Sequence, residues 1–245
     1  MISLLLTAAL TLAEMPGGDE ARFAACRTLI KSNPQRALDE ADAWAKKTAD
    51  VPAQQCLGLA FVGLERWEPA ALTFATAAQD AEIKRDGRAA LLWTQAGNAA
   101  LGGDDPGKAR QYLDRAVALP TLPAQLRGEA YLDRARADVA LGDMVLGRID
   151  LDKALALVPK DPFAWLLSAT LARRESEFER AGKDIVEATR LAPDDPAVAL
   201  EAGNIAAARG QADAALAAWS RAAQLGPKDP AGLAAAAALK ANKQP

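Results

Sequence analysis

The chain has 245 residues, of which 51% are hydrophobic. Alanine supplies much of that share, and only 5% of the residues are aromatic. Its formal net charge of -3 gives no positive field with which to neutralise the phosphates of a nucleic acid. Histidine, the commonest general base near neutral pH and the commonest metal ligand, is absent from the sequence. The two cysteines, Cys26 and Cys56, are too few for a structural zinc site. We therefore expect no nucleic-acid partner, no metal and no cofactor.

Residues 1–13, MISLLLTAALTLA, form an uncharged apolar run that ends before Glu14 and the turn signal Pro16-Gly17-Gly18. The run is too short to span a bilayer comfortably and has the shape of a secretory signal, with small residues before a cleavage site after Ala13. It carries no Lys or Arg in its first part. We expect a signal peptide; the alternatives are a buried N-terminal helix of a cytoplasmic protein and a short uncleaved membrane anchor.

The C-terminal half repeats with a period of 34 residues. Several independent positions recur in phase, which composition bias does not produce. They are Ala154, Ala188 and Ala222; Pro159, Pro193 and Pro227; Asp161, Asp195 and Asp229; and Pro162, Pro196 and Pro230.

Each repeat reads as a helix hairpin. The Asp of each Asp-Pro pair can accept hydrogen bonds from the first free N–H groups of a helix, and Pro at the first helical position loses no bond. A first helix is therefore predicted to begin at Pro162, Pro196 and Pro230 and to end at a turn such as Gly210-Gln211. A second helix follows and stops before the next proline, as at Pro227.

This pattern resembles the tetratricopeptide repeat family. The unit 196–229 carries the residue types of the family's motif at matching positions, namely Gly203, Asn204, Gly210, Ala215, Trp219, Ala222 and Pro227. The resemblance implies an all-α fold, a right-handed α-solenoid of antiparallel helix hairpins. It covers nearly the whole chain after the apolar run.

The repeat register predicts one solenoid over residues 18–242. Upstream of residue 128 the period lengthens, with extra residues near Gly87 and between Pro120 and Pro123. The last stretch has only the first helix of a unit and is predicted to be a cap that closes the open apolar end. The predicted units are 18–50, 51–89, 90–127, 128–161, 162–195 and 196–229, with the cap at 230–242.

The resemblance also implies a partner-binding groove on the concave face, lined by positions 2, 5, 9 and 12 of the first helices. In such a groove amides hold an extended backbone and arginines meet carboxylates. The family's lysine at position 5, which clamps a terminal carboxylate, is replaced here by residues such as Thr94, so a clamp of that kind is not expected. Each lining residue can equally be a packing residue. The predicted lining residues are Asn98, Leu132, Arg136, Phe163, Leu166, Thr170, Arg173, Leu200 and Asn204.

The family's geometry brings the helix positions of Cys26 and Cys56 close together in neighbouring units. If the chain is exported, this implies a disulfide between them. The alternative is two buried, reduced thiols in a cytoplasmic protein.

The acidic and glycine-rich segment Gly102-Gly103-Asp104-Asp105 could suggest a phosphate loop or an acid/base pair. It lacks the strand, lysine and hydroxyl that a phosphate loop needs. A turn followed by helix capping explains the same residues.

Together these patterns favour a non-catalytic scaffold that binds a partner protein or peptide, in the periplasm or secreted. A second hypothesis is a membrane-tethered assembly factor that keeps residues 1–13 in the inner membrane and exposes the solenoid to the cytoplasm as a docking platform. An enzyme ranks last, because the sequence has no histidine, no nucleophile motif and no metal-ligand cluster.

Overall fold

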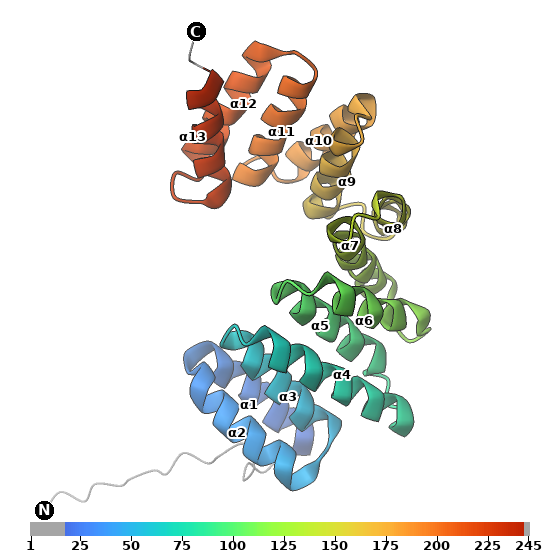
Figure 1. Ribbon diagram of the computed structural model, residues 1–245. Helices are drawn as coiled ribbons and strands as arrows, with labels where there is room; N and C mark the ends of the chain where they lie inside the picture. Colours follow the sequence, from blue (N-terminus) through green and yellow to red (C-terminus); the bar gives the residue numbers. More distant parts are fainter. Residues whose placement is uncertain (1–17, 243–245) are drawn as a thin grey trace, which may run out of the picture. The chain divides into compact units, whose positions relative to one another are not determined.

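The structure, a computed structural model, describes residues 18–242, and within that range the chain forms thirteen α-helices and no strand (Figure 1). The expected all-α fold is confirmed. The described chain divides into two compact parts, which we call the N-terminal module, ending at Leu141, and the C-terminal module, starting at Gly142. This division falls inside the predicted unit 128–161, so the single solenoid stays a prediction. The predicted signal at 1–13 lies outside the described residues.

Seven helices make up the described N-terminal module, and helices that follow one another in the chain pack together. Mostly short turns separate them, including Gly103–Asp105, where Asp104 has a left-handed backbone with φ of 57°. The helices are α1 (Gly18–Ser32), α2 (Pro34–Thr48), α3 (Val51–Gly63), α4 (Trp67–Lys84), α5 (Ala89–Gly102), α6 (Pro106–Ala118) and α7 (Ala124–Ala140).

Six helices make up the described C-terminal module: α8 (Met144–Leu157), α9 (Pro162–Arg174), α10 (Phe178–Leu191), α11 (Pro196–Ala208), α12 (Ala212–Leu225) and α13 (Pro230–Asn242). The predicted starts of α9, α11 and α13 are confirmed. Their caps form as expected, because the Asp161 carboxylate accepts from the Phe163 N–H at 2.9 Å and the Asp195 carboxylate from the Ala197 N–H at 2.7 Å.

In the α3–α4, α5–α6 and α11–α12 hairpins, a glycine of the first helix meets a large residue of the second. A Cβ atom added to Gly203 would lie 2.4 Å from Trp219, and one added to Gly97 would lie 2.5 Å from Leu113. Gly58 bears the same relation to Phe74. These pairs occupy the same two positions of their units, so a missing side chain on one helix makes room for a large one on the other.

The last described helix, α13, packs on α11 and α12. Its backbone lies so close to the preceding loop that a Cβ atom on Gly232 would be 1.8 Å from the Gly226 carbonyl oxygen. Ala235 of α13 is buried in the same cluster as Trp219. This helix therefore covers apolar residues of the α11–α12 hairpin, and its role as the cap of the array stays a prediction.

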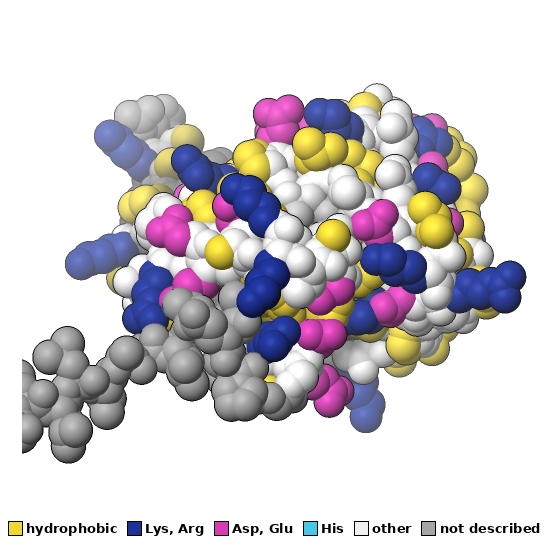
Figure 2. Space-filling model, turned by 90° about the horizontal axis from the view of Figure 1, so that it is seen from below, with side chains coloured by type: hydrophobic (Ala, Val, Ile, Leu, Met, Phe, Trp, Pro, Cys, Tyr) yellow, Lys and Arg dark blue, Asp and Glu magenta, His cyan; other side chains and the backbone are white. Residues whose placement is uncertain are grey.

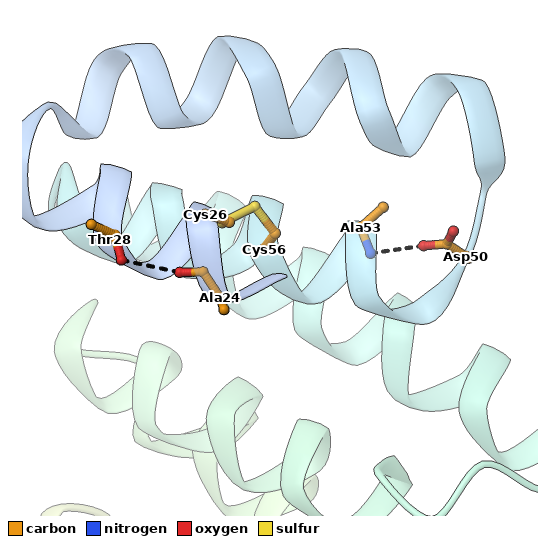
Figure 3. The surroundings of a disulfide bond; sticks show 6 residues. All are labelled: Ala24, Cys26, Thr28, Asp50, Ala53 and Cys56. Carbon is orange, nitrogen blue, oxygen red and sulfur yellow. Dashed lines mark hydrogen bonds between the residues drawn. A yellow bond between two sulfur atoms is a disulfide. The ribbon is translucent and has the colours of Figure 1, made fainter. Parts of the chain in front are cut away.

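At the other end of the chain, a disulfide joins Cys26 of α1 to Cys56 of α3, with the two Cα atoms 6.2 Å apart (Figure 3). The pairing implied by the resemblance is thus present in the structure. Both cysteines are fully buried in a cluster with Trp44 of α2. Close by, the Asp50 carboxylate caps α3 by accepting from the Ala53 N–H at 2.8 Å. The disulfide therefore links the first hairpin of the N-terminal module to the next helix covalently.

Candidate functional site

The predicted lining residues all lie on the first helices of hairpins. Those of the N-terminal module come from α5 and α7, which are in contact, and those of the C-terminal module come from α9 and α11, which are also in contact. We call the surfaces that carry these residues the first-helix faces of the two modules. Asn98, Leu132 and Arg136 belong to the N-terminal module, and the other six belong to the C-terminal module.

On the N-terminal module, a single carboxylate joins two of the three predicted residues. Asp133 of α7 accepts from Arg136 Nη1 at 2.9 Å, one helical turn further on, and from the side chain of Asn98 on α5. The Asp133 side chain is 14% exposed, whereas that of Arg136 is 43% exposed. The cluster therefore ties neighbouring first helices together and leaves the guanidinium at the surface.

Burial raises the pKa of Asp133 above its ordinary value of 3.8. The charge of Arg136 and the hydrogen bonds from Arg136 and Asn98 act in the opposite direction, and Glu129 adds to the increase. Desolvation is the largest of these effects, so the folded protein holds this carboxylate at a cost when it is ionised. A carboxylate with a raised pKa is a candidate functional group, although ion-pair networks also perturb pKa values.

On the C-terminal module, Glu201 of α11 has the equivalent role. Its carboxylate accepts from Arg173 of α9 at 2.6 and 3.3 Å and from Asn204 Nδ2 at 3.1 Å. The Asn204 carbonyl oxygen accepts from Trp219 Nε1 at 3.0 Å. Both the amide nitrogen and the carbonyl oxygen of Asn204 thus have hydrogen-bond partners inside the protein. The charge of Arg173 is neutralised by the buried carboxylate of Glu201.

The two clusters share an arrangement of residues that was not predicted from the sequence. Asp133 and Glu201 both occupy position 6 of their units, three residues before a polar residue at position 9. Residues three apart on a helix are neighbours, so this spacing was the available signal. The other partner of each carboxylate comes from the preceding first helix, and that contact is set by the packing of one unit on the next.

The remaining predicted residues give the first-helix face of the C-terminal module an apolar character. Phe163 at the start of α9 is 43% exposed, and Leu166 and Leu200 are partly buried against the core. The Thr170 hydroxyl donates to the Leu166 carbonyl oxygen at 2.8 Å, within its own helix. This face offers apolar surface beside a cluster whose charges are already paired.

Leu132, predicted to line the groove, is buried in the structure. It is only 3% exposed and counts among the buried apolar residues of the chain. Its neighbour Asp133 carries the polar contacts of this part of α7. A leucine at position 5 is buried here because its aliphatic side chain gains more from the packed interior than from water.

Charged side chains of both signs are mixed on the surface of the protein. Lys and Arg side chains are interspersed with Asp and Glu side chains on the face shown in Figure 2. The described residues contain no group of three or more Asp, Glu or Cys side chains that could hold a metal ion. Residues 18–242 also include no helix long and apolar enough to pass through a membrane.

The raised pKa of Asp133 makes a prediction for stability. A folded state that binds a proton more readily than the unfolded state loses stability as pH rises through the folded-state pKa. Asp133→Asn, which keeps the shape and stays neutral, should therefore raise the free energy of unfolding near neutral pH. The gain should shrink as the pH falls into the acid range, where wild-type Asp133 is protonated.

Thermal unfolding followed by circular dichroism across this pH range measures the effect, with Asp39→Asn on the exposed surface of α2 as the control for net charge. A loss of stability at neutral pH in Asp133→Asn would mean that the ion pair with Arg136 outweighs the cost of burial.

No protein-family model matches the chain, and no curated protein matches it in sequence. Solved structures do match it. PilF of Pseudomonas aeruginosa has a TM-score of 0.72 at 16% identity, over 90% of this chain and 97% of PilF. PilW, described as a widely conserved type IV pilus biogenesis factor, has a TM-score of 0.74 at 19% identity, over 88% of this chain and 97% of PilW.

YrrB, described as a TPR protein with an unusual peptide-binding site, has a TM-score of 0.58 at 17% identity, over 80% of this chain and 97% of YrrB. Identities this low establish the fold alone. Thirteen described helices, which pack on their neighbours in the chain within each module and include three hairpins with glycine-to-large-residue contacts, agree with that fold. The chain therefore has the fold of the tetratricopeptide-repeat proteins, and the resemblance read from its repeat is confirmed.

Proposed function

We propose that the protein is a non-catalytic scaffold that binds a segment of a partner protein on its first-helix faces. The observation that carries the proposal is the first-helix face of the C-terminal module. There Phe163 is 43% exposed and Leu166 and Leu200 are only partly buried, whereas Trp219 and Ile185 of the same module are buried. A half-exposed aromatic beside aliphatic side chains is the kind of anchor that dominates protein interfaces.

The polar clusters give the proposed interface its second component. Arg173 and Asn204 are held by Glu201, so neither pays the full entropic cost of ordering when a partner arrives. Arg136 on the other module keeps its guanidinium at the surface while it contacts Asp133. Such fixed polar groups set the orientation of a bound segment, and apolar contacts supply most of its affinity.

The likeness to solved structures supports a binding role. YrrB is described as having a peptide-binding site, and PilW as a pilus biogenesis factor. The lack of histidine in the sequence removes the usual general base for catalysis near neutral pH.

A location outside the cytoplasm, in the periplasm or the secreted fraction, completes the proposal. It is supported by the apolar run at residues 1–13 and by the disulfide, because disulfides persist in oxidising compartments. The second candidate keeps residues 1–13 as an inner-membrane anchor with the helices in the cytoplasm. The buried disulfide favours the first, since a reducing compartment keeps thiols free.

Intact-mass measurement of the protein isolated from its native host tests this location. Export predicts a chain that begins near Glu14 and gains about 2 Da when it is unfolded with reductant, because the disulfide takes up two hydrogens. A full-length chain that resists extraction from membranes and shows no mass change on reduction would contradict export.

Two single substitutions test the binding face, one on the first-helix face of the C-terminal module and one on a second helix of the same module. Phe163→Asp replaces the proposed anchor with a charge, whereas Val145→Asp makes the same change at an exposed position of the second helix α8 in the same module. We expect Phe163→Asp to reduce the amount of partner recovered by crosslinking from the native host at least about tenfold, in line with the loss of an interface anchor. Val145→Asp should leave recovery unchanged.

Circular dichroism should show that both variants stay folded, because both side chains are exposed in the structure. Equal recovery with Phe163→Asp and wild type would show that the first-helix face of the C-terminal module does not bind the partner.

A further inference from the structure

The N-terminal module has a hollow of about 560 Å³ that lies away from the predicted lining residues. It is bounded by the first half of α4, by the turn between α5 and α6, by the start of α6 and by Leu141 after α7. Ala71, Ala99, Ala100 and Tyr112 form apolar parts of its lining. None of the nine predicted lining residues borders it.

One wall of the hollow is built by the turn that the sequence marks with two glycines. A Cβ atom on Gly102 would lie 2.7 Å from the Trp67 ring, and one on Gly103 would lie 3.0 Å from the Trp67 Cβ atom. The backbone of the turn is therefore in close contact with Trp67, the first residue of α4. Asp105 then caps α6, its carboxylate accepting from the Lys108 N–H at 2.9 Å. These contacts fix the wall before any partner binds.

Exposed apolar residues gather at the mouth of this hollow. In the described N-terminal module, the large apolar side chains that stay exposed are Leu72 at 64%, Ile83 at 81% and Leu141 at 47%. Leu72 and Leu141 both border the hollow, whereas Ile83 does not. Two exposed leucines beside a preformed apolar hollow mark a surface that gains free energy when it is covered.

The rim of the hollow is acidic. Glu68, Asp104 and Asp105 line it, against a single cation, Lys108. Lys108 is itself engaged, with its Nζ 3.1 Å from the Asp105 carboxylate and 3.9 Å from that of Glu68. Asp104 has a left-handed backbone conformation, and its side chain is exposed. The rim thus carries a net negative charge, and the complementary ligand is positively charged.

From this combination we propose a second docking site, at the hollow between α4 and α6, for a short protein segment in which leucine-like side chains stand next to lysine or arginine. The apolar side chains fill the hollow and cover Leu72 and Leu141, and the basic neighbours meet the acidic rim. The proposal rests on the scaffold function and adds a contact point formed largely by second helices. It also gives the Gly102–Asp105 turn a role.

Two fluorescein-labelled synthetic peptides are the probes. The first carries two leucines flanked by lysines, and the second is identical except that glutamates replace the lysines. Fluorescence anisotropy with the full chain should show saturable binding of the lysine peptide and binding at least about tenfold weaker for the glutamate peptide, since like charges across an interface repel. Absence of saturable binding of the lysine peptide, or equal binding of both peptides, overturns the proposal.

Substitutions in the protein separate docking from general attraction between opposite charges. Leu72→Asp and Leu141→Asp each add a negative charge, so nonspecific attraction would strengthen binding of the lysine peptide. The proposal predicts the reverse, a loss of about tenfold in affinity, because the apolar contact is removed. Ile83→Asp adds the same charge to the same module away from the hollow and should not weaken binding.

Equal weakening by Ile83→Asp, or stronger binding by Leu72→Asp, would contradict the site. Because all three residues are exposed, circular dichroism should show native helix content in each variant. Asp104→Asn supplies a further check, since it should weaken binding of the lysine peptide and lessen its dependence on salt.

The outcome is independent of the test of the first-helix face. Phe163→Asp lies in the other module and should leave binding of the lysine peptide unchanged. Failure of the peptide experiment with loss of the native partner in Phe163→Asp would leave the scaffold function standing and remove only the second site. The opposite pattern would keep a binding role and place it at the hollow.

Discussion

The close approach of the two helices in the α3–α4, α5–α6 and α11–α12 hairpins is the constraint on which the rest of the structure depends. Gly58, Gly97 and Gly203 have no side chain. A large residue of the second helix can therefore reach the backbone of the first, and this residue is a phenylalanine, a leucine and a tryptophan, respectively. This contact sets the distance between the helices and directs the large residues inward. Neighbouring first helices then contact each other, as α5 contacts α7 and α9 contacts α11.

The carboxylates at position 6 depend on that arrangement. Asp133 and Glu201 each hold a residue of their own helix and a residue of the preceding first helix, so they join one unit to the next while they order the polar groups beside the surface. Burial raises the pKa of Asp133, which means that this order costs stability when the carboxylate is ionised.

Local signals made much of the fold predictable. Asp161 and Pro162 mark the start of α9 because capping and a preset φ are properties of adjacent residues. The site was less predictable, since its contacts join residues of different units. Arg173 and Glu201 are 28 positions apart, and no local pattern shows that they form an ion pair. Leu132 was placed on the surface by its position in the unit, but packing buries it.

Replacing Gly203 tests the packing constraint most directly. Helix propensity alone favours alanine over glycine by about 1 kcal/mol, so Gly203→Ala would stabilise α11 if the space beside Trp219 were open. We expect instead a loss of about 1–3 kcal/mol, seen as a lower Tm, because the added methyl group would collide with the Trp219 ring. Gly107→Ala in α6, where the nearest atom is an ordinary 3.6 Å away, should keep or raise the Tm. A Tm for Gly203→Ala equal to or above that of the wild type would contradict the account.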